Sequence, residues 1–162
     1  MKGNGANFSD DGMYRYLLWR TWHESRPHVL WVLLNPSTAD AVTPDRTVNA
    51  CTAFSKAWQH GGLEIVNLFA YRTPNPKALC SAQDPIGCEN DRYIREAAKR
   101  ATRIVVGWGN KGVNKERDQD VCRLLLESTS QPLCCLGTNL NGTPRHPLYV
   151  PRTTCLTTYS CR

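Results

Sequence analysis

Polar side chains gather in four short segments, each of which follows an apolar run. These segments are NPSTAD (35–40), Asn67 with FAYRTPNP (69–76), GWGNKG (107–112) and GTPRHPLY (142–149). Each contains amide, hydroxyl, guanidinium or imidazole groups, together with a proline or glycine that restricts or redirects the backbone. A loop with only a structural role needs turn residues but not this set of polar groups. The four segments are therefore candidates for one binding or catalytic site.

Asn35 and His146 are the main catalytic candidates. An asparagine amide can donate and accept hydrogen bonds, and a neutral imidazole can donate to an oxygen that becomes negative during a reaction. The alternative for Asn35 is that it only braces its own loop. The alternative for His146 is that it only packs against the loop between Arg145 and Pro147.

Asp40 and Asp45 are the acids nearest to Asn35 in the sequence. Either could take a proton from a water molecule. Asp45 stands directly before Arg46 and Thr47, where a helix is expected to begin, so helix capping is the favoured interpretation for Asp45. For Asp40 both interpretations stay open.

The remaining polar and aromatic residues of the four segments are candidates for substrate binding. Arg72 and Arg145 could hold phosphate oxygens, or they could form surface ion pairs. Trp108 lies between two glycines, and a core position is the favoured interpretation over a platform on which a base stacks. Tyr149 could take either position. The full set of binding candidates is Pro36, Ser37, Thr38, Asn67, Arg72, Trp108, Asn110, Arg145 and Tyr149.

The apolar pattern predicts the elements that would bring these segments together. HVLWVLL (28–34) is continuously apolar, which is typical of a central strand covered on both faces. Further strands are expected at 63–71, 103–110 and 132–137, with helices at 45–62, 88–101 and 116–129 and a possible edge strand at 14–22. Strands separated by helices pair in parallel. The prediction is an α/β fold, a three-layer sandwich with a four-stranded parallel sheet, in one domain over 1–162.

In such sheets, ligands bind beyond the carboxyl ends of the strands, which is where all four polar segments are expected. The formal charge of +6 favours a polyanionic partner. No apolar stretch approaches the roughly 18 residues of a membrane span, and the first residues lack a secretory signal, so a cytoplasmic protein without a membrane partner is expected.

The eight cysteines contain no C-x-x-C pair and no matching histidine spacing. They are interpreted as reduced thiols that act as small hydrophobic residues. Two alternatives involve Cys80 and Cys88: a zinc or iron–sulfur site with distant partners, and a thiol enzyme. We expect no metal and no cofactor.

Two resemblances rest on these residues. LNPSTADA, VNLFAYR, WGN and PRHPLY, in this order, look like a widespread bacterial and phage family of uncharacterised proteins. More distantly, VLWVLLNPSTADA resembles the first motif of the uracil-DNA glycosylase superfamily, IVNLFAYRTPNP resembles its base-reading segment, and GTPRHPLY resembles its H-P-S loop. The likeness covers about residues 28 to 150, but Leu34 and Ser37 replace glycines of that superfamily.

The resemblance implies that Asn35 orients the attacking water, Asn67 reads an extruded base and His146 stabilises the departing base anion. We therefore expect cleavage of an N-glycosidic bond in DNA or a nucleotide. One alternative is a non-catalytic module that binds a modified base, a nucleotide or DNA. The other is base exchange on free nucleotides. The cysteines do not match the cluster ligands of the iron–sulfur branch.

Overall fold

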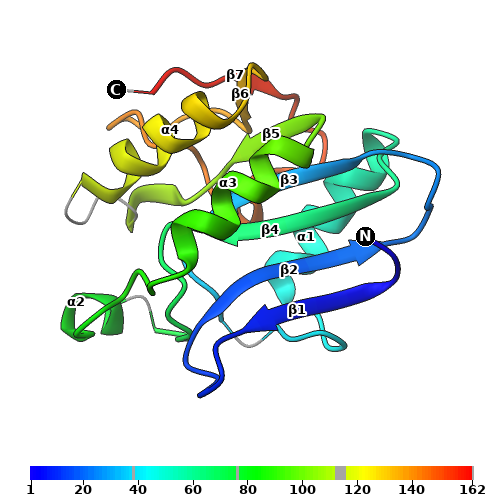
Figure 1. Cartoon of the computed structure of the whole chain (residues 1–162). Coiled ribbons are helices and arrows are strands. Elements are labelled where there is room, and N and C mark those ends of the chain that lie inside the picture. Colours follow the sequence, from blue (N-terminus) through cyan, green and yellow to red (C-terminus); the bar gives the residue numbers. More distant parts are fainter. Residues whose placement is uncertain (38, 76, 112–115, 162) are drawn as a thin grey trace.

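The protein is a mixed α/β structure built on one sheet, seen in a computed structural model that describes residues 1–37, 39–75, 77–111 and 116–161 (Figure 1). Within these residues the sheet has seven strands in the order β1-β2-β4-β3-β5-β6-β7. The strands are β1 Asn4–Phe8, β2 Arg15–Thr21, β3 His28–Leu33, β4 Gly62–Asn67, β5 Arg103–Val106, β6 Leu133–Cys135 and β7 Thr157–Thr158. The four α-helices of the same residues are α1 Arg46–Ala57, α2 Ala78–Ser81, α3 Asn90–Arg100 and α4 Arg117–Ser128.

The centre of the sheet is parallel and its edges are antiparallel. β3 pairs in parallel with β4 and β5, and β5 pairs in parallel with β6. β1 and β2 add an antiparallel hairpin beside β4, and β7 adds a short antiparallel strand beside β6. The α/β class is confirmed. The sheet has more strands than the predicted four with one extra edge strand. The prediction missed β1 and β7 because these strands are short and carry no apolar pattern.

β2 is an inner strand, which corrects the prediction that the strand near 14–22 forms an edge. β1 covers it on the side away from β4. Gly5 permits this pairing, because a β-carbon at that position would lie 2.1 Å from the ring of Trp19. The arginines of β2 are consequently buried between neighbouring elements instead of facing solvent.

Helices cover both faces of the sheet (Figure 1). On one face, Leu30 and Val32 of β3 pack with residues of α3 and α4. On the other face, Val29 and Trp31 of the same strand pack with residues of α1. Successive side chains of a strand point to opposite faces, so a strand that is covered on both sides is apolar throughout. The run at 28–34 is apolar throughout because helices cover both faces of β3.

The helix after β3 is shorter than the predicted range 45–62. Asp45 caps α1, and the helix ends at Ala57 with Trp58 as its C-cap. Gln59 then takes a left-handed conformation with φ of 61°, which reverses the chain. Gly61 belongs to the return into β4, because a β-carbon there would lie 2.1 Å from the backbone oxygen of His23.

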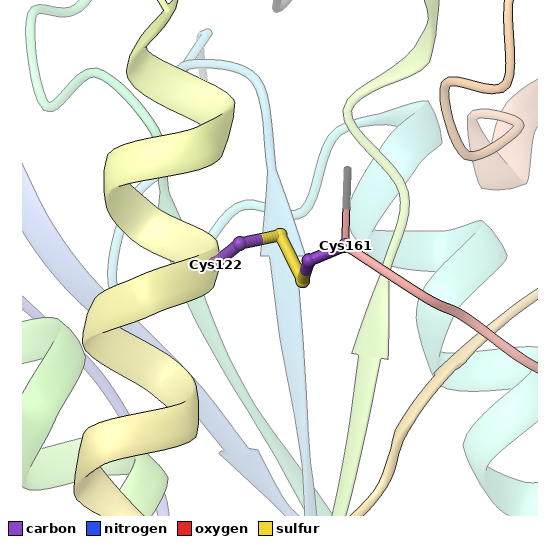
Figure 2. Close-up of a disulfide and its surroundings, with 2 residues drawn as sticks. All are labelled: Cys122 and Cys161. Atoms are coloured by element: carbon purple, nitrogen blue, oxygen red, sulfur yellow. A yellow bond between two sulfur atoms is a disulfide. The ribbon is translucent and has the colours of Figure 1, made fainter.

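A disulfide joins Cys122 of α4 to Cys161 near the end of the chain (Figure 2). The prediction that all eight cysteines are reduced thiols is therefore wrong for these two. β7 pairs with β6 and Tyr159 packs edge-on against Trp108, and this brings the C-terminal segment onto α4. No helix of the described residues is long and apolar enough to cross a membrane.

Candidate functional site

A cavity of about 540 Å³ opens beyond the carboxyl ends of the parallel strands, and we name it the main cavity. Its walls come from the loops after all four parallel strands, together with Thr47 of α1. The lining residues are Leu34, Asn35, Ser37, Thr47, Thr73, Pro74, Trp108, Gly109, Asn110, Asn139, Arg145, His146, Leu148 and Tyr149. The position is the one that a parallel α/β sheet favours for ligands.

A second, smaller space of about 40 Å³ lies behind the main cavity, and we name it the inner chamber. The two share Asn35, Ser37, Thr47 and His146 in their walls. The further walls of the inner chamber are Arg15, Leu33, Asp45, Val48, Ile65 and Asn67. Its volume matches about one water molecule. The structure thus brings Asn35, Asn67 and His146 around one polar chamber, although they lie in three different segments of the chain.

His146 is held as a neutral ring. Its Nδ1 atom accepts a hydrogen bond from the backbone N–H of Leu148 over 3.2 Å. Burial lowers the pKa of His146 to about 4. A neutral ring whose Nδ1 accepts must carry its proton on Nε2, so Nε2–H is available as a donor.

Two glycines allow the His146 loop to lie close to the end of β5. Gly109 has a φ of +72°, and a β-carbon there would lie 3.4 Å from Cβ of His146. A β-carbon at Gly107 would lie 3.1 Å from Cδ of Pro147. A larger residue would strain the backbone at position 109, and at position 107 it would require Pro147 to shift by a small amount.

Asn35 joins the loops after β3 and β4. Its Nδ2 atom donates to the backbone oxygens of Pro36 (2.9 Å) and Thr73 (2.8 Å), and the backbone N–H of Thr73 donates to the Pro36 oxygen (3.0 Å). Both donors of the amide are thus used, as the bracing interpretation expected. Because both partners are carbonyls, the orientation of the amide is defined. Its Oδ1 atom is the group that can accept a hydrogen bond from a ligand.

Asn67 is buried with an unused amide. The side chain is 1% exposed, and neither Nδ2 nor Oδ1 has a hydrogen-bond partner among the described residues. Its backbone is held firmly, because Nδ2 of Asn90 donates to the oxygens of Asn67 and Leu68, both at 3.0 Å. Arg117 also donates to the Leu68 oxygen over 2.9 Å. An unpaired buried amide is costly, so a polar partner in the inner chamber would be favourable.

Arg15 lines the inner chamber and was not among the predicted site residues. Its Nη1 atom donates to the backbone oxygen of Ala39 over 2.6 Å, while its buried Nε has no partner among the described residues. Burial lowers the pKa of Arg15 to about 10, and Asp45 partly opposes this shift. Arg20, also on β2, donates to the backbone oxygen of Asp40 over 2.5 Å. The only signal in the sequence was the alternation of arginine and aromatic residues in this strand.

The two candidate acids have different surroundings. Oδ1 of Asp40 accepts from the backbone N–H groups of Thr43 (2.7 Å) and Val42 (2.8 Å), and these bonds lower the pKa of Asp40. Asp40 lines neither the main cavity nor the inner chamber. Oδ1 of Asp45 accepts from the Val48 N–H over 2.8 Å, so Asp45 caps α1 and also lines the inner chamber.

Aromatic and cationic groups lie around the main cavity. Tyr149 is 81% exposed, and its ring centre lies 5.5 Å from that of His146. Nε of Arg145 donates to the Thr138 oxygen over 3.1 Å. Trp108 is buried in the core and also lines the cavity. Asn110 accepts from the Thr143 hydroxyl over 2.9 Å.

Three described residues of the predicted binding set, Asn67, Arg72 and Pro36, do not line the main cavity, and Asn67 lines the inner chamber instead. Arg72 lines a separate cavity of about 380 Å³, which we name the side cavity. Pro36 is buried and contributes its backbone oxygen to the loop contact described above. Thr38 lies outside the described residues.

Thr47, Thr73 and Asn139 line the main cavity and were not predicted. Thr47 lies in the first turn of α1, where a cavity position cannot be distinguished from a helix surface by sequence pattern. The described residues contain no group of three or more histidine, cysteine or acidic side chains that could hold a metal ion.

A family model described as "Protein of unknown function (DUF1643)" matches residues 15–148. The match spans β2 to β6 and includes the three loops that carry Asn35, Asn67 and His146. No curated protein matches the chain, and no solved structure matches it.

Proposed function

Since this chain belongs to the DUF1643 family, whose function is unknown, we propose from the site itself that the protein binds a nucleobase in DNA or in a nucleotide and hydrolyses its N-glycosidic bond. The observation that carries the proposal is that Asn35, Asn67 and His146 surround one chamber of about 40 Å³. That chamber fits the water molecule that a hydrolysis needs.

Three residues of the inner chamber have roles that follow from the hydrogen bonds they make. Oδ1 of Asn35 accepts a hydrogen bond from the water and thereby orients it. The C1′–N bond breaks with its electron pair on the base, and the water oxygen bonds to C1′. The water proton passes to Asp45, the carboxylate of the inner chamber. Nε2–H of His146 donates to the base oxygen that becomes negative.

The main cavity supplies the space for the nucleotide. Its volume of about 540 Å³ lies in the range of small-molecule sites. The exposed ring of Tyr149 offers a stacking surface for a base that has left its own stack. The terminal nitrogens of Arg145 can hold a phosphate oxygen while Nε stays bonded to Thr138.

The resemblance to the uracil-DNA glycosylase superfamily agrees with this proposal. The parallel strands β4, β3, β5 and β6, with helices on both faces, support a related sandwich. Asn35 follows β3 and His146 follows β6, as that resemblance requires. The net charge of +6 is compatible with DNA as the partner.

A non-catalytic base-binding module is the second candidate, and the small volume of the inner chamber favours it. A space for one water is too small to admit a base to Asn67, so Asn67 would contact the base only through that water. Leu34 lines the main cavity at a position where the resembled superfamily has glycine, so its side chain occupies space that a glycine would leave to the base.

The test is base release from DNA that carries uracil, mismatched thymine or modified bases, measured as alkali-sensitive abasic sites. We expect release by the wild type and a loss of at least about a hundredfold in His146→Gln and Asn35→Ala. His23→Gln is the matched control, because His23 is exposed and lines neither cavity.

Binding without release would favour the second candidate. The absence of both binding and release across the panel would refute both candidates. Equal loss in the His23 variant would show that the effect of His146→Gln is not specific to the site.

A further inference from the structure

The side cavity adjoins the main cavity and has no role in the proposed chemistry. Gly12 and Met13 of the β1–β2 turn form one wall, and Tyr71 and Arg72 of the loop after β4 form another. Ser37 and Pro74 complete it, and both also line the main cavity. The two cavities therefore meet at these two shared residues.

Arg72 is the charged group of the side cavity. Its Nη1 atom donates to the Gly12 oxygen over 2.9 Å, and its guanidinium lies 4.8 Å from the centre of the Phe8 ring. Its buried Nε has no hydrogen-bond partner, and no carboxylate of the described residues forms a salt bridge with it. A guanidinium that is fixed in place and forms no salt bridge is well suited to bind a phosphate.

The residues around Arg72 can contact the sugar and base of a nucleotide as well as its phosphate. Met13 is 46% exposed at the side cavity and offers apolar contact to a sugar or base. Ser37 lines both cavities, and a serine hydroxyl can donate to a phosphate oxygen. With Arg145 in the main cavity and Arg72 in the side cavity, each space has its own cation.

We propose that the side cavity binds the nucleotide next to the one in the main cavity, with Arg72 on the phosphodiester that joins them. This inference rests on the proposed function and extends it: the ligand is a strand of phosphodiester-linked nucleotides, not a free nucleotide. A free nucleotide in the main cavity would not reach into the side cavity, and Arg72 would then make no contact with the ligand.

The experiment compares three probes by fluorescence anisotropy competition: a mononucleotide, a dinucleotide with a phosphodiester, and the same dinucleotide with an uncharged methylphosphonate linkage. We expect the phosphodiester probe to bind about tenfold more tightly than each of the other two. DNA and RNA versions of the dinucleotide show which sugar the strand carries. These comparisons use the wild-type protein, so they do not depend on the folding of any variant.

In Arg72→Gln, the preference for the phosphodiester over the methylphosphonate should fall from about tenfold to about one, while mononucleotide binding stays the same. Arg95→Gln is the matched control, because Arg95 is exposed on α3 and lines none of the three cavities. It should retain the full preference.

Two results would overturn the inference alone: a phosphodiester dinucleotide that binds no more tightly than the mononucleotide, or a methylphosphonate that binds as tightly as the phosphodiester. Both would leave the proposed function standing. If no probe binds but the DNA panel shows base release, the inference fails alone; if neither binding nor release is seen, the proposed function fails together with it.

Discussion

Nδ1 of His146 accepts a hydrogen bond from the backbone N–H of Leu148, two residues further along the chain. This contact is local, but it defines the chemistry of the ring, because it leaves the proton on Nε2. Burial lowers the pKa of the same ring to about 4. His146 therefore donates from a neutral ring across the range in which a free histidine would titrate.

Burial of His146 makes the stability of the fold depend on pH. The folded pKa is about 4 and the unfolded value is 6.5, so the unfolded chain binds more protons between these values. The contribution of His146 to the free energy of unfolding is fully present above pH 6.5 and is lost as the pH drops toward 4. At pH 4.5 the loss from this group is about 2 to 3 kcal/mol.

Urea denaturation at pH 7 and pH 4.5 measures this loss. His146→Gln should reduce the difference between the two pH values without removing it, since burial also lowers the pKa values of His28 and His60. An unchanged difference in the variant would contradict the assignment of His146 as a buried neutral ring.

Asn67→Leu should raise the free energy of unfolding by about 1 to 3 kcal/mol while it abolishes base binding or release. The Asn67 amide has no partner among the described residues, so an apolar side chain of similar size removes a desolvation cost. A substitution that raises the free energy of unfolding while it removes function is typical of a residue in a binding or catalytic site.

Asn90→Leu is the matched control for this substitution. Asn90 is equally buried, but its Nδ2 atom donates to two backbone oxygens, so its replacement should destabilise the protein. Thermal and urea denaturation of both variants measure the two effects. Destabilisation by Asn67→Leu as large as that by Asn90→Leu would mean that Asn67 has a structural role.

Asp45→Asn should lower base release about a hundredfold with little change in stability. Asparagine caps helices as well as aspartate does, so the bond from Val48 is retained, while the carboxylate of the inner chamber is lost. Single-turnover rates and thermal denaturation separate the two effects.

Asp40→Asn is the matched substitution outside the cavities, and it should release bases at nearly the wild-type rate. The carboxylate of Asp40 accepts hydrogen bonds from Val42 and Thr43 of its own turn, and Asp40 lines neither the main cavity nor the inner chamber. If Asp40→Asn slowed release and Asp45→Asn did not, the assignment of the two acids would be reversed.

Cys161→Ser should lower the free energy of unfolding by about 2 to 4 kcal/mol under oxidising conditions. The disulfide closes a loop with a sequence separation of 39 residues, and its loss frees the unfolded chain. Denaturation with and without dithiothreitol measures the effect. Under reducing conditions the variant and the wild type should become similar.

Cys155→Ser is the control for this prediction, because Cys155 is exposed and outside the disulfide. Its stability should match that of the wild type with and without the reductant. A wild-type protein whose stability does not respond to dithiothreitol would contradict a stabilising role for the disulfide.

The central elements could be predicted from the sequence because their signals are local. β3 has an apolar run because both of its faces are buried. Val48, Cys51 and Phe54 recur at helical spacing because one face of α1 is buried. The order of strands and helices then implied parallel pairing and placed the polar loops at one end of the sheet. Asn35, Asn67 and His146 became candidates for this reason.

The tertiary structure alone decided which polar atoms form hydrogen bonds and which buried polar atoms have no partner among the described residues. The burial of Arg15 could not be predicted from its strand, because it depends on β1 and on the loop at Ala39. Asn67 became an unpaired amide only when its neighbours were placed, and the pairing of Cys122 with Cys161 required β7 to lie beside β6. Hydrogen bonds and disulfides between distant segments leave no periodic pattern in a sequence, because they depend on how those segments pack.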